Sequence, residues 1–316
     1  MRDDHDAGHV AIIGVGHVGM AAAAALFHAT LVSRLTLVDL DERRAEGEAM
    51  DLMHGQALVG PCDVRSGGVE ALAGAAVVVV CAGVSQQPGE NRIDLLGRNA
   101  EVFRSIAAGL DEHAPDAVVL IATNPVDVMT RLFASMTSRP PEAVIGTGTT
   151  LDSARLRALL GRRYRVDPQS VHGYVLGEHG DTEMVPWSLV TIGGTRIRGR
   201  TVLGVPWDEA AMRELADHVR TAAYEIIDRK GYTSWAIGSV IRELVAAVLR
   251  DERTIAPVTV PLTGEYGIEG PWLSLPARIG RDGIDAVIAP PLDPDEQEAL
   301  AASAAALDEV HAALDP

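Results

Sequence analysis

The sequence predicts an α/β protein, with a doubly wound parallel sheet in residues 1–150 and a second, α+β substrate domain in residues 151–316. Two observations support this fold class. Short apolar runs of strand length alternate with helix-like stretches through the first half. After about Thr150 the pattern changes to long helices and short β-like segments broken by glycines.

In the first half, β-branched and apolar residues predict buried strands at residues 10–13, 35–38, 77–80 and 118–121. Helices are expected over residues 20–27 and 42–53, and helix-like stretches separate the later strands. In such an open sheet, ligands bind at the carboxyl ends of the strands.

The second half is expected to begin with a helix over residues 152–160, followed by short β segments within 185–202. Long helices over 209–250, interrupted near Gly231, precede a β-rich stretch over 255–288 and a final helix over 295–313. We find no internal repeat and no long linker, so the two halves are expected to share an interface where a site can form.

Composition excludes several classes of function. The 316 residues are 47% apolar and 22% charged, which is typical of a globular protein with a large core. The net charge of −17 argues against nucleic-acid and anionic-membrane partners. Two cysteines are too few for a metal-ligand quartet or a disulfide framework, so no metal and a reducing compartment are expected. The acidic N-terminus does not resemble a secretory signal, which favours the cytoplasm.

The segment from Gly14 to Gly19 has the pattern G-x-G-x-x-G and lies between the first predicted strand and helix. Its glycines would permit a tight turn, close approach of a pyrophosphate, and close packing of helix on strand. Alone this pattern is weak, because a structural glycine turn would have the same sequence.

Asp39 strengthens the interpretation as a dinucleotide site. It ends the second predicted strand 20 residues beyond Gly19, where a carboxylate can accept both ribose hydroxyls and would repel a 2′-phosphate. The alternative role of Asp39 is a helix cap. The pair of features favours NAD over NADP as cofactor.

Five further segments carry residues suited to the reduction of a small 2-oxo acid, which needs a cationic clamp, a proton donor and a dry pocket. These segments are residues 81–92, 122–127, 152–155, 177–181 and 230–237. Through them the chain resembles the lactate and malate dehydrogenase family over nearly its entire length, and the lactate branch most closely. The resemblance implies hydride exchange between NAD and a 2-hydroxy acid, with pyruvate and lactate as the substrate pair.

Residues 81–92 resemble the mobile active-site loop of that family, and Gly83, Pro88 and Gly89 would give it hinges. The resemblance implies that Arg92 enters on closure and stabilises the charge developing on the substrate oxygen. The other interpretation of Arg92 is a solvated surface arginine. Gln86 occupies the discriminating position, where a malate dehydrogenase would carry arginine. A neutral amide favours the uncharged methyl group of pyruvate.

The resemblance assigns His179, in Gly-Glu-His-Gly-Asp, as the proton donor. Asp152 would accept a hydrogen bond from its ring, fix the tautomer and favour the imidazolium. Arg155 would grip the substrate carboxylate through two parallel hydrogen bonds. By spacing alone, Asp152 and Arg155 would instead form an ordinary ion pair within a helix, and loop histidines are mostly incidental.

Other positions follow from the resemblance alone. Asn124 and Thr233 would contact the substrate, and Ile237 would contact the nicotinamide ring. The purely structural alternatives are a turn at Asn124, a helix cap at Thr233 and a core position at Ile237. The remaining cofactor-binding positions implied are Gly14, Gly16, Val18, Gly19, Asp39, Arg44, Gly83, Ser105, Ala122, Asn124 and Thr147.

Arg157 and His172 match positions at which bacterial members bind fructose 1,6-bisphosphate between subunits, with surface salt bridges as the alternative. A homo-oligomer, a tetramer, is expected. Gln87 and Asn91 depart from the residues usual in the family, which puts turnover and loop kinetics in doubt more than the type of reaction.

Three competing functions remain open at this point. One is a malate or L-2-hydroxyisocaproate-type dehydrogenase, and another is an NAD-sensing binding protein that has lost turnover. The latter would have little need to keep Arg92, Asp152, Arg155 and His179 together. A nucleic-acid-binding role is disfavoured by the acidic charge balance.

Overall fold

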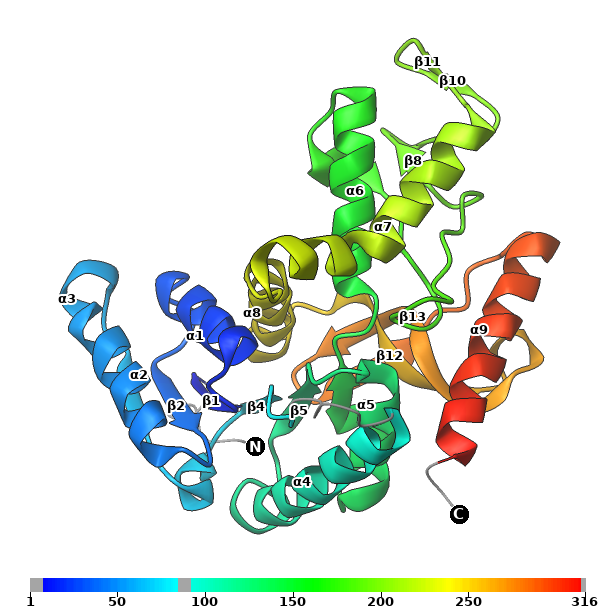
Figure 1. The fold of residues 1–316 in the computed structure, drawn as a ribbon. Helices are drawn as coiled ribbons and strands as arrows, with labels where there is room; N and C mark the ends of the chain where they lie inside the picture. Colours follow the sequence, from blue (N-terminus) through cyan, green and yellow to red (C-terminus); the bar gives the residue numbers. More distant parts are fainter. Residues whose placement is uncertain (1–7, 85–91, 314–316) are drawn as a thin grey trace.

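The computed structural model describes residues 8–84 and 92–313, and in the second range it describes side chains from residue 95 onward (Figure 1). Six strands of the first half form a parallel sheet in the order β3-β2-β1-β4-β5-β6. The strands are β1 (His9–Ile13), β2 (Arg34–Val38), β3 (Asp63–Ser66), β4 (Val77–Val80), β5 (Val118–Ile121) and β6 (Val144–Gly146). This order confirms the predicted doubly wound sheet, which is of the Rossmann type. Its switch point, where ligands bind in such folds, lies between β1 and β4.

Helices connect these strands and cover the two faces of the sheet, as parallel connections require (Figure 1). They are α1 (His17–His28), α2 (Glu42–His54), α3 (Gln56–Val59), α4 (Arg92–His113) and α5 (Val126–Met136), with short 3₁₀ turns η1 (Val69–Leu72) and η2 (Pro141–Ala143). β1, β4 and β5 are buried along their whole length, which explains their continuous apolar sequences.

Three antiparallel strands of the second half extend the same sheet beyond β6, giving nine strands in all. They are β12 (Thr254–Thr263), β13 (Glu269–Gly280) and β14 (Gly283–Val287). β12 meets β6 where Thr259 pairs with Gly146. The second half therefore builds directly onto the first, and the two share a large hydrophobic core.

Among the remaining elements, helices α8 (Trp235–Leu249) and α9 (Pro294–Ala312) pack against the large sheet and contribute to its core, and the 3₁₀ turn η4 (Glu265–Gly267) links β12 to β13. Above the sheet, helices α6 (Thr150–Tyr164) and α7 (Glu209–Lys230), with the 3₁₀ turn η3 (Pro168–Ser170), form a smaller body (Figure 1). Its short strands are β7 (Val171–His172), β8 (Thr191–Ile192), β9 (Thr195–Arg196), β10 (Thr201–Val202) and β11 (Val205–Pro206). A second hydrophobic cluster, which includes Leu156, Leu160, Tyr164 and Met212, holds α6 and α7 against these strands.

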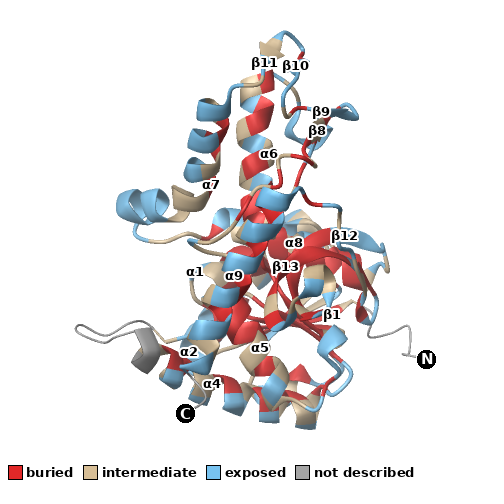
Figure 2. Ribbon diagram, turned by 90° about the vertical axis from the view of Figure 1, so that its right-hand side faces the viewer, coloured by how far each residue is buried: buried red, intermediate tan, exposed pale blue. Residues whose placement is uncertain are grey.

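Helix α8 packs tightly on α1 of the coenzyme half. A Cβ at Gly238 would lie 2.7 Å from the backbone carbon of Ala21, so the two helices approach at a distance that only glycine permits. Figure 2 shows the buried residues concentrated in the strands and on the inward faces of the helices. This contact fixes the start of α8, where Thr233 and Ile237 lie, relative to the glycine turn.

The sequence predicted β1, β2, β4 and β5 and the longer helices correctly, and it missed α3, β3, β6 and β7. In β3 only Val64 is buried, because the strand lies at the edge of the sheet, while α3, β6 and β7 have only two to four residues. Within the described residues, no helix has both the length and the apolar character needed to cross a membrane.

Candidate active site

The turn after β1 requires glycine at Gly14 and Gly19, the first and third glycines of the G-x-G-x-x-G pattern. Gly14 has a φ of +96°, and a Cβ there would lie 2.6 Å from the backbone nitrogen of Ala82. A Cβ on Gly19 would lie 1.9 Å from the carbonyl oxygen of Gly14. These two glycines are therefore explained by packing within the protein.

Gly16 is different, because a Cβ there would meet no atom within 4 Å. Its φ of −74° is also accessible to any residue. Gly16 is the N-cap of α1, and no side chain caps the helix or places a negative charge in its first turn. The N–H groups of this helix start and the open space before them fit a dinucleotide pyrophosphate.

Asp39 follows β2 and faces this turn. One carboxylate oxygen accepts the Val15 N–H at 2.7 Å, and the other accepts the Asp41 N–H at 3.0 Å. The helix-cap alternative for Asp39 is wrong, since the N-cap of α2 is Asp41, which accepts the N–H of Arg44. Asp39 is thus held at the end of β2 beside the glycine turn, where a ribose would lie.

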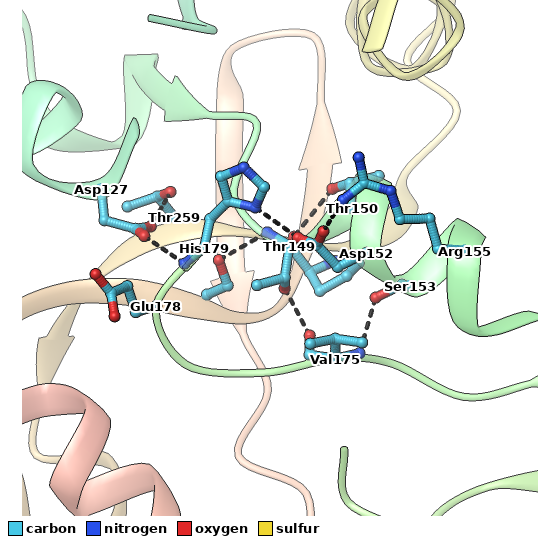
Figure 3. Close-up of polar contacts among 12 residues, drawn as sticks. Asp127, Thr149, Thr150, Asp152, Ser153, Arg155, Val175, Glu178, His179 and Thr259 are labelled. Atoms are coloured by element: carbon cyan, nitrogen blue, oxygen red, sulfur yellow. Dashed lines mark hydrogen bonds and ion pairs between the residues drawn. The ribbon is translucent and has the colours of Figure 1, made fainter. Parts of the chain in front are cut away.

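The predicted partners Asp152 and His179 are in direct contact (Figure 3). His179 Nδ1 lies 2.6 Å from Asp152 Oδ2, and because a carboxylate only accepts, the ring donates. Asp152 is 1% exposed, whereas the His179 side chain is 21% exposed and so accessible to a substrate. The bond holds Nδ1 and turns Nε2 to the outside.

The imidazolium form of His179 is strongly favoured. Burial by itself lowers the pKa of the ring, but the charge and hydrogen bond of Asp152, with the charges of Asp127 and Glu183, outweigh it. Together they raise the pKa of His179 to about 9. At neutral pH the ring therefore carries the proton that a general acid needs.

Arg155 lies on the same face of α6 as Asp152. Its Nη1 is 2.7 Å from Asp152 Oδ1, so the ion pair expected from spacing alone is present. Asp152 thus uses one oxygen for the guanidinium and the other for the imidazole. The arrangement places two positive groups on either side of one buried carboxylate, and this pair can attract an anionic substrate.

Glu183 is a member of this group that the sequence did not indicate. A ring nitrogen of His179 and one carboxylate oxygen each of Asp152 and Glu183 all lie within 4.8 Å of one another. Burial and the charge of Asp152 raise the pKa of Glu183, although His179, Arg155 and Arg220 act in the opposite direction. Its position four residues after His179 was the only signal available in the sequence.

Three buried residues from distant elements hold the loop that carries His179, two through their side chains and one through its backbone. The Asp127 carboxylate accepts the His179 N–H at 2.7 Å (Figure 3). Ser303 of α9 accepts the Glu178 N–H at 2.8 Å, and Ser274 of β13 exchanges backbone hydrogen bonds with Gly177. None of these anchors was assigned a role from the sequence, because they lie 52 to 125 positions away from the loop.

The segment from residue 230 to 237 lies against the glycine turn. The rings of His17 and Tyr232 stack with centroids 3.7 Å apart and an interplanar angle of 6°. Thr233 is half-buried, and the N-cap of α8 is Ser234, so Thr233 is not the cap. Ile237 is half-buried and packs against the main core.

Other implied positions are placed by the structure as follows. Asn124 is exposed between β5 and α5, three residues before Asp127. Gly83 lies beside Thr123, since a Cβ there would be 2.9 Å from Thr123 Cγ2. Val18 lies in α1 and Arg44 in α2, while Ser105 is on an exposed face of α4. Ala122 directly follows β5, and Thr147 directly follows β6.

Gln86, Gln87 and Asn91 lie outside the described residues. Arg92 begins α4, and its side chain also lies outside them. Arg157 donates from Nε to the Pro168 carbonyl at 3.3 Å, and His172 is exposed on β7.

Comparison with known families agrees with this geometry. The family model described as lactate/malate dehydrogenase, NAD binding domain, matches residues 8–146. The model described as lactate/malate dehydrogenase, alpha/beta C-terminal domain, matches residues 149–313. The protein is accordingly an NAD-dependent oxidoreductase by class. More particularly, the chain belongs to the lactate/malate dehydrogenase family.

Similar proteins match along almost the whole chain. An L-lactate dehydrogenase of Salinibacter ruber is 53% identical over 306 residues, covering 96% of this chain and 97% of that protein. One of Thermus aquaticus is 44% identical over 311 residues, covering 96% and 99%. The crystal structure of a minor L-lactate dehydrogenase from Enterococcus mundtii, in a ligands-bound form, has a TM-score of 0.94 at 37% identity and covers 97% and 98%.

Proposed function

We propose that this chain is an L-lactate dehydrogenase that reduces pyruvate to L-lactate with NADH and catalyses the reverse reaction. The observation that carries the proposal is the 2.6 Å contact between His179 Nδ1 and a fully buried Asp152, with Arg155 on the other oxygen of the same carboxylate. Relatives named L-lactate dehydrogenase, at up to 53% identity, support the choice of substrate.

NAD is the cofactor that fits the site, with its pyrophosphate at Gly16 and the start of α1 and its ribose at Asp39. When bound, the nicotinamide supplies or accepts the hydride. Because Asp152 holds Nδ1, the proton that reaches the substrate oxygen leaves His179 from Nε2. In lactate oxidation the same nitrogen takes the proton back.

Arg155 is the residue that binds the substrate carboxylate. Its ion pair with Asp152 uses Nη1, and the planar guanidinium carries further N–H donors for a second carboxylate. Asn124 and Thr233 complete the substrate contacts, and Ile237 lines the nicotinamide. Arg92 stabilises the developing oxygen charge on loop closure, and Gln86 selects the methyl end of pyruvate.

The test is an NADH-oxidation assay with pyruvate, oxaloacetate and 2-oxoisocaproate measured side by side. We expect the highest kcat/KM for pyruvate. A preference for oxaloacetate or for 2-oxoisocaproate would instead identify a malate or L-2-hydroxyisocaproate-type dehydrogenase.

A binding protein without turnover is separated from an enzyme by the variant His179→Asn. It should abolish turnover and leave NADH affinity unchanged, since the ring lies at the substrate end of the site. Wild-type activity in this variant would remove the histidine from the mechanism.

The expected homo-oligomer is supported by apolar side chains exposed on helices α2, α3, α7 and α8, among them Met53, Leu58, Ile227 and Trp235. Light scattering during size exclusion should show a tetramer. A monomer at working concentration would contradict it. The cytoplasmic location and the domain division at residue 150 stay predictions.

Activation by fructose 1,6-bisphosphate through Arg157 and His172 is the least supported part of the proposal. Pyruvate saturation curves with and without the sugar bisphosphate test it. Superimposable curves would end the idea.

A further inference from the structure

Asp127 is a buried carboxylate directly behind the proton donor, and the reaction outlined above assigns it no part. It is 2% exposed and lies in the first turn of α5, three residues after Asn124. Its Oδ2 accepts the His179 N–H at 2.7 Å, and its Oδ1 accepts the Thr259 hydroxyl at 2.6 Å. Figure 3 shows it on the backbone side of His179, away from Asp152.

Both partners of Asp127 are donors. A backbone N–H and a hydroxyl that donates require two acceptor oxygens, which is the ionised form of the carboxyl. Burial raises the pKa of Asp127 to about 6, against the effect of the two hydrogen bonds and the charge of His179. Asp127 is therefore mostly negative at neutral pH, in a setting where charge is weakly screened.

We propose that Asp127 is a positioning residue for the proton donor: it fixes the backbone at His179 and its negative charge stabilises the imidazolium. The inference rests on the proposed function of His179 as general acid. The hydrogen bond from the His179 N–H to Asp127 links the loop of His179 to the segment that carries Asn124. It therefore fixes the distance between Asn124 and His179, the two residues that would face the substrate. Thr259 of β12 in turn fixes the rotamer of Asp127.

Several other charges face His179. Asp152 of α6 bonds directly to Nδ1, and Glu183 acts through its charge from the same loop. Arg155 pairs with the Asp152 oxygen that His179 does not use, and Glu178 is the residue directly before His179 in the chain. Asp152 sets the tautomer, because it alone among these carboxylates bonds to the ring within the described residues. Asp127 contributes charge and backbone position without touching the ring.

The variant Asp127→Asn separates charge from shape. An amide oxygen can accept the His179 N–H, while the amide nitrogen can donate to the Thr259 oxygen, so both hydrogen bonds survive. Only the negative charge is lost. A purely structural role would leave the titration of His179 unchanged in this variant.

The matched control is Asp308→Asn, which changes net charge equally. Asp308 lies on α9 and its side chain is half exposed. It forms an ion pair at 3.0 Å with Arg131 of α5, the helix that also carries Asp127. It is not among the charges that act on His179. It reports the effect of one lost carboxylate away from the site.

The experiment is an NMR titration of ¹³C,¹⁵N-histidine-labelled enzyme without coenzyme or substrate, with the His179 signal assigned by its loss in His179→Asn. We expect Asp127→Asn to lower the pKa of His179 by about half a unit or more, and Asp308→Asn to leave it unchanged. The alkaline limb of pyruvate reduction should move down by the same amount, with NADH affinity unaltered. An unchanged His179 titration in folded Asp127→Asn overturns the proposal.

If Asp127→Asn fails to fold, Thr259→Val decides. This variant removes the hydroxyl that donates to Asp127, and its loss should raise the pKa of the Asp127 carboxyl. With less negative charge at Asp127, the pKa of His179 should fall, by a smaller amount than in Asp127→Asn. Thr259→Ser keeps the hydroxyl and should restore the pKa of His179. Wild-type titration and kcat in Thr259→Val would overturn the proposal. Because the titration needs no substrate, its result is independent of whether pyruvate is turned over.

Discussion

His179 donates a 2.6 Å hydrogen bond from Nδ1 to Asp152, a carboxylate with only 1% exposure. The two residues lie 27 positions apart, one in a glycine-bounded loop and the other in the first turn of α6. Their contact converts a partly buried imidazole into a cation at neutral pH. Most of the expected behaviour of the site follows from this bond.

Asp152→Asn should lower kcat for pyruvate reduction by about 100-fold or more, because an amide supplies no charge to hold the imidazolium. Stopped-flow measurement of turnover, together with NADH fluorescence titration, checks this. The coenzyme affinity should be unaffected. A kcat within two-fold of wild type would show that the contact is incidental.

Pyruvate reduction should decline as pH rises through about 9, the pKa to which His179 is raised, and lactate oxidation should gain over the same range. A profile of kcat/KM against pH in both directions measures this. A limb of pyruvate reduction centred near pH 7 would contradict the assignment.

Stability should follow the same titration. The folded pKa of His179 is above its unfolded value of about 6.5, so the stabilisation is fully present below that pH and is lost as pH rises through about 9. Thermal unfolding between pH 6 and pH 10 should show a smaller alkaline loss of Tm in His179→Asn than in wild type. Equal losses in the two proteins would exclude this source of stability.

Gly16→Val should fold normally yet lose more than about ten-fold in NADH affinity, because the new side chain enters space where no protein atom lies within 4 Å. Gly47→Ala is the matched control, since it also meets open space but lies on an exposed part of α2. Fluorescence titration and Tm separate the two effects. Unaltered NADH binding in Gly16→Val would place the pyrophosphate elsewhere.

Gln86→Arg should shift the ratio of kcat/KM toward oxaloacetate by about ten-fold or more, since a guanidinium can pair with the second carboxylate. Gln87→Arg introduces the same charge one position along the chain and should shift the ratio far less. Steady-state kinetics on both substrates provide the measurement. Equal shifts in the two variants would indicate a general charge effect.

Ser303→Ala should destabilise the catalytic loop by about 1 kcal/mol, because it leaves the partly buried Glu178 N–H without its acceptor. Because the Thr182 hydroxyl donates to the Glu178 carboxylate, Ser303 donates its own hydroxyl to Thr182. In the variant, the Glu178 N–H and the Thr182 hydroxyl therefore each lose one hydrogen-bond partner. Urea unfolding measures the change, with the exposed Ser135→Ala as control. Equal stability of both variants would show that α9 does not hold the loop.

Local patterns in the sequence were sufficient for the fold class and for several site residues. The valine-rich strand β4, the glycine turn and Asp39 are each recognisable within about 25 residues of chain, and periodicity and turn chemistry act over that range. Asp152, Arg155 and His179 were recognised because their short segments resemble those of a known family. Their contact is a property of the folded chain.

Asp127, Ser303 and Glu183 had no such local signal. An aspartate after a turn, a serine in an alanine-rich helix and a glutamate near a histidine are ordinary in composition, and their roles depend on burial and on partners as far as 125 residues away. The sequence by itself determined most of the elements of the first half and the glycine turn at which we propose that the pyrophosphate binds. Only the tertiary structure decided which carboxylates face the imidazole, because desolvation and charge act through space.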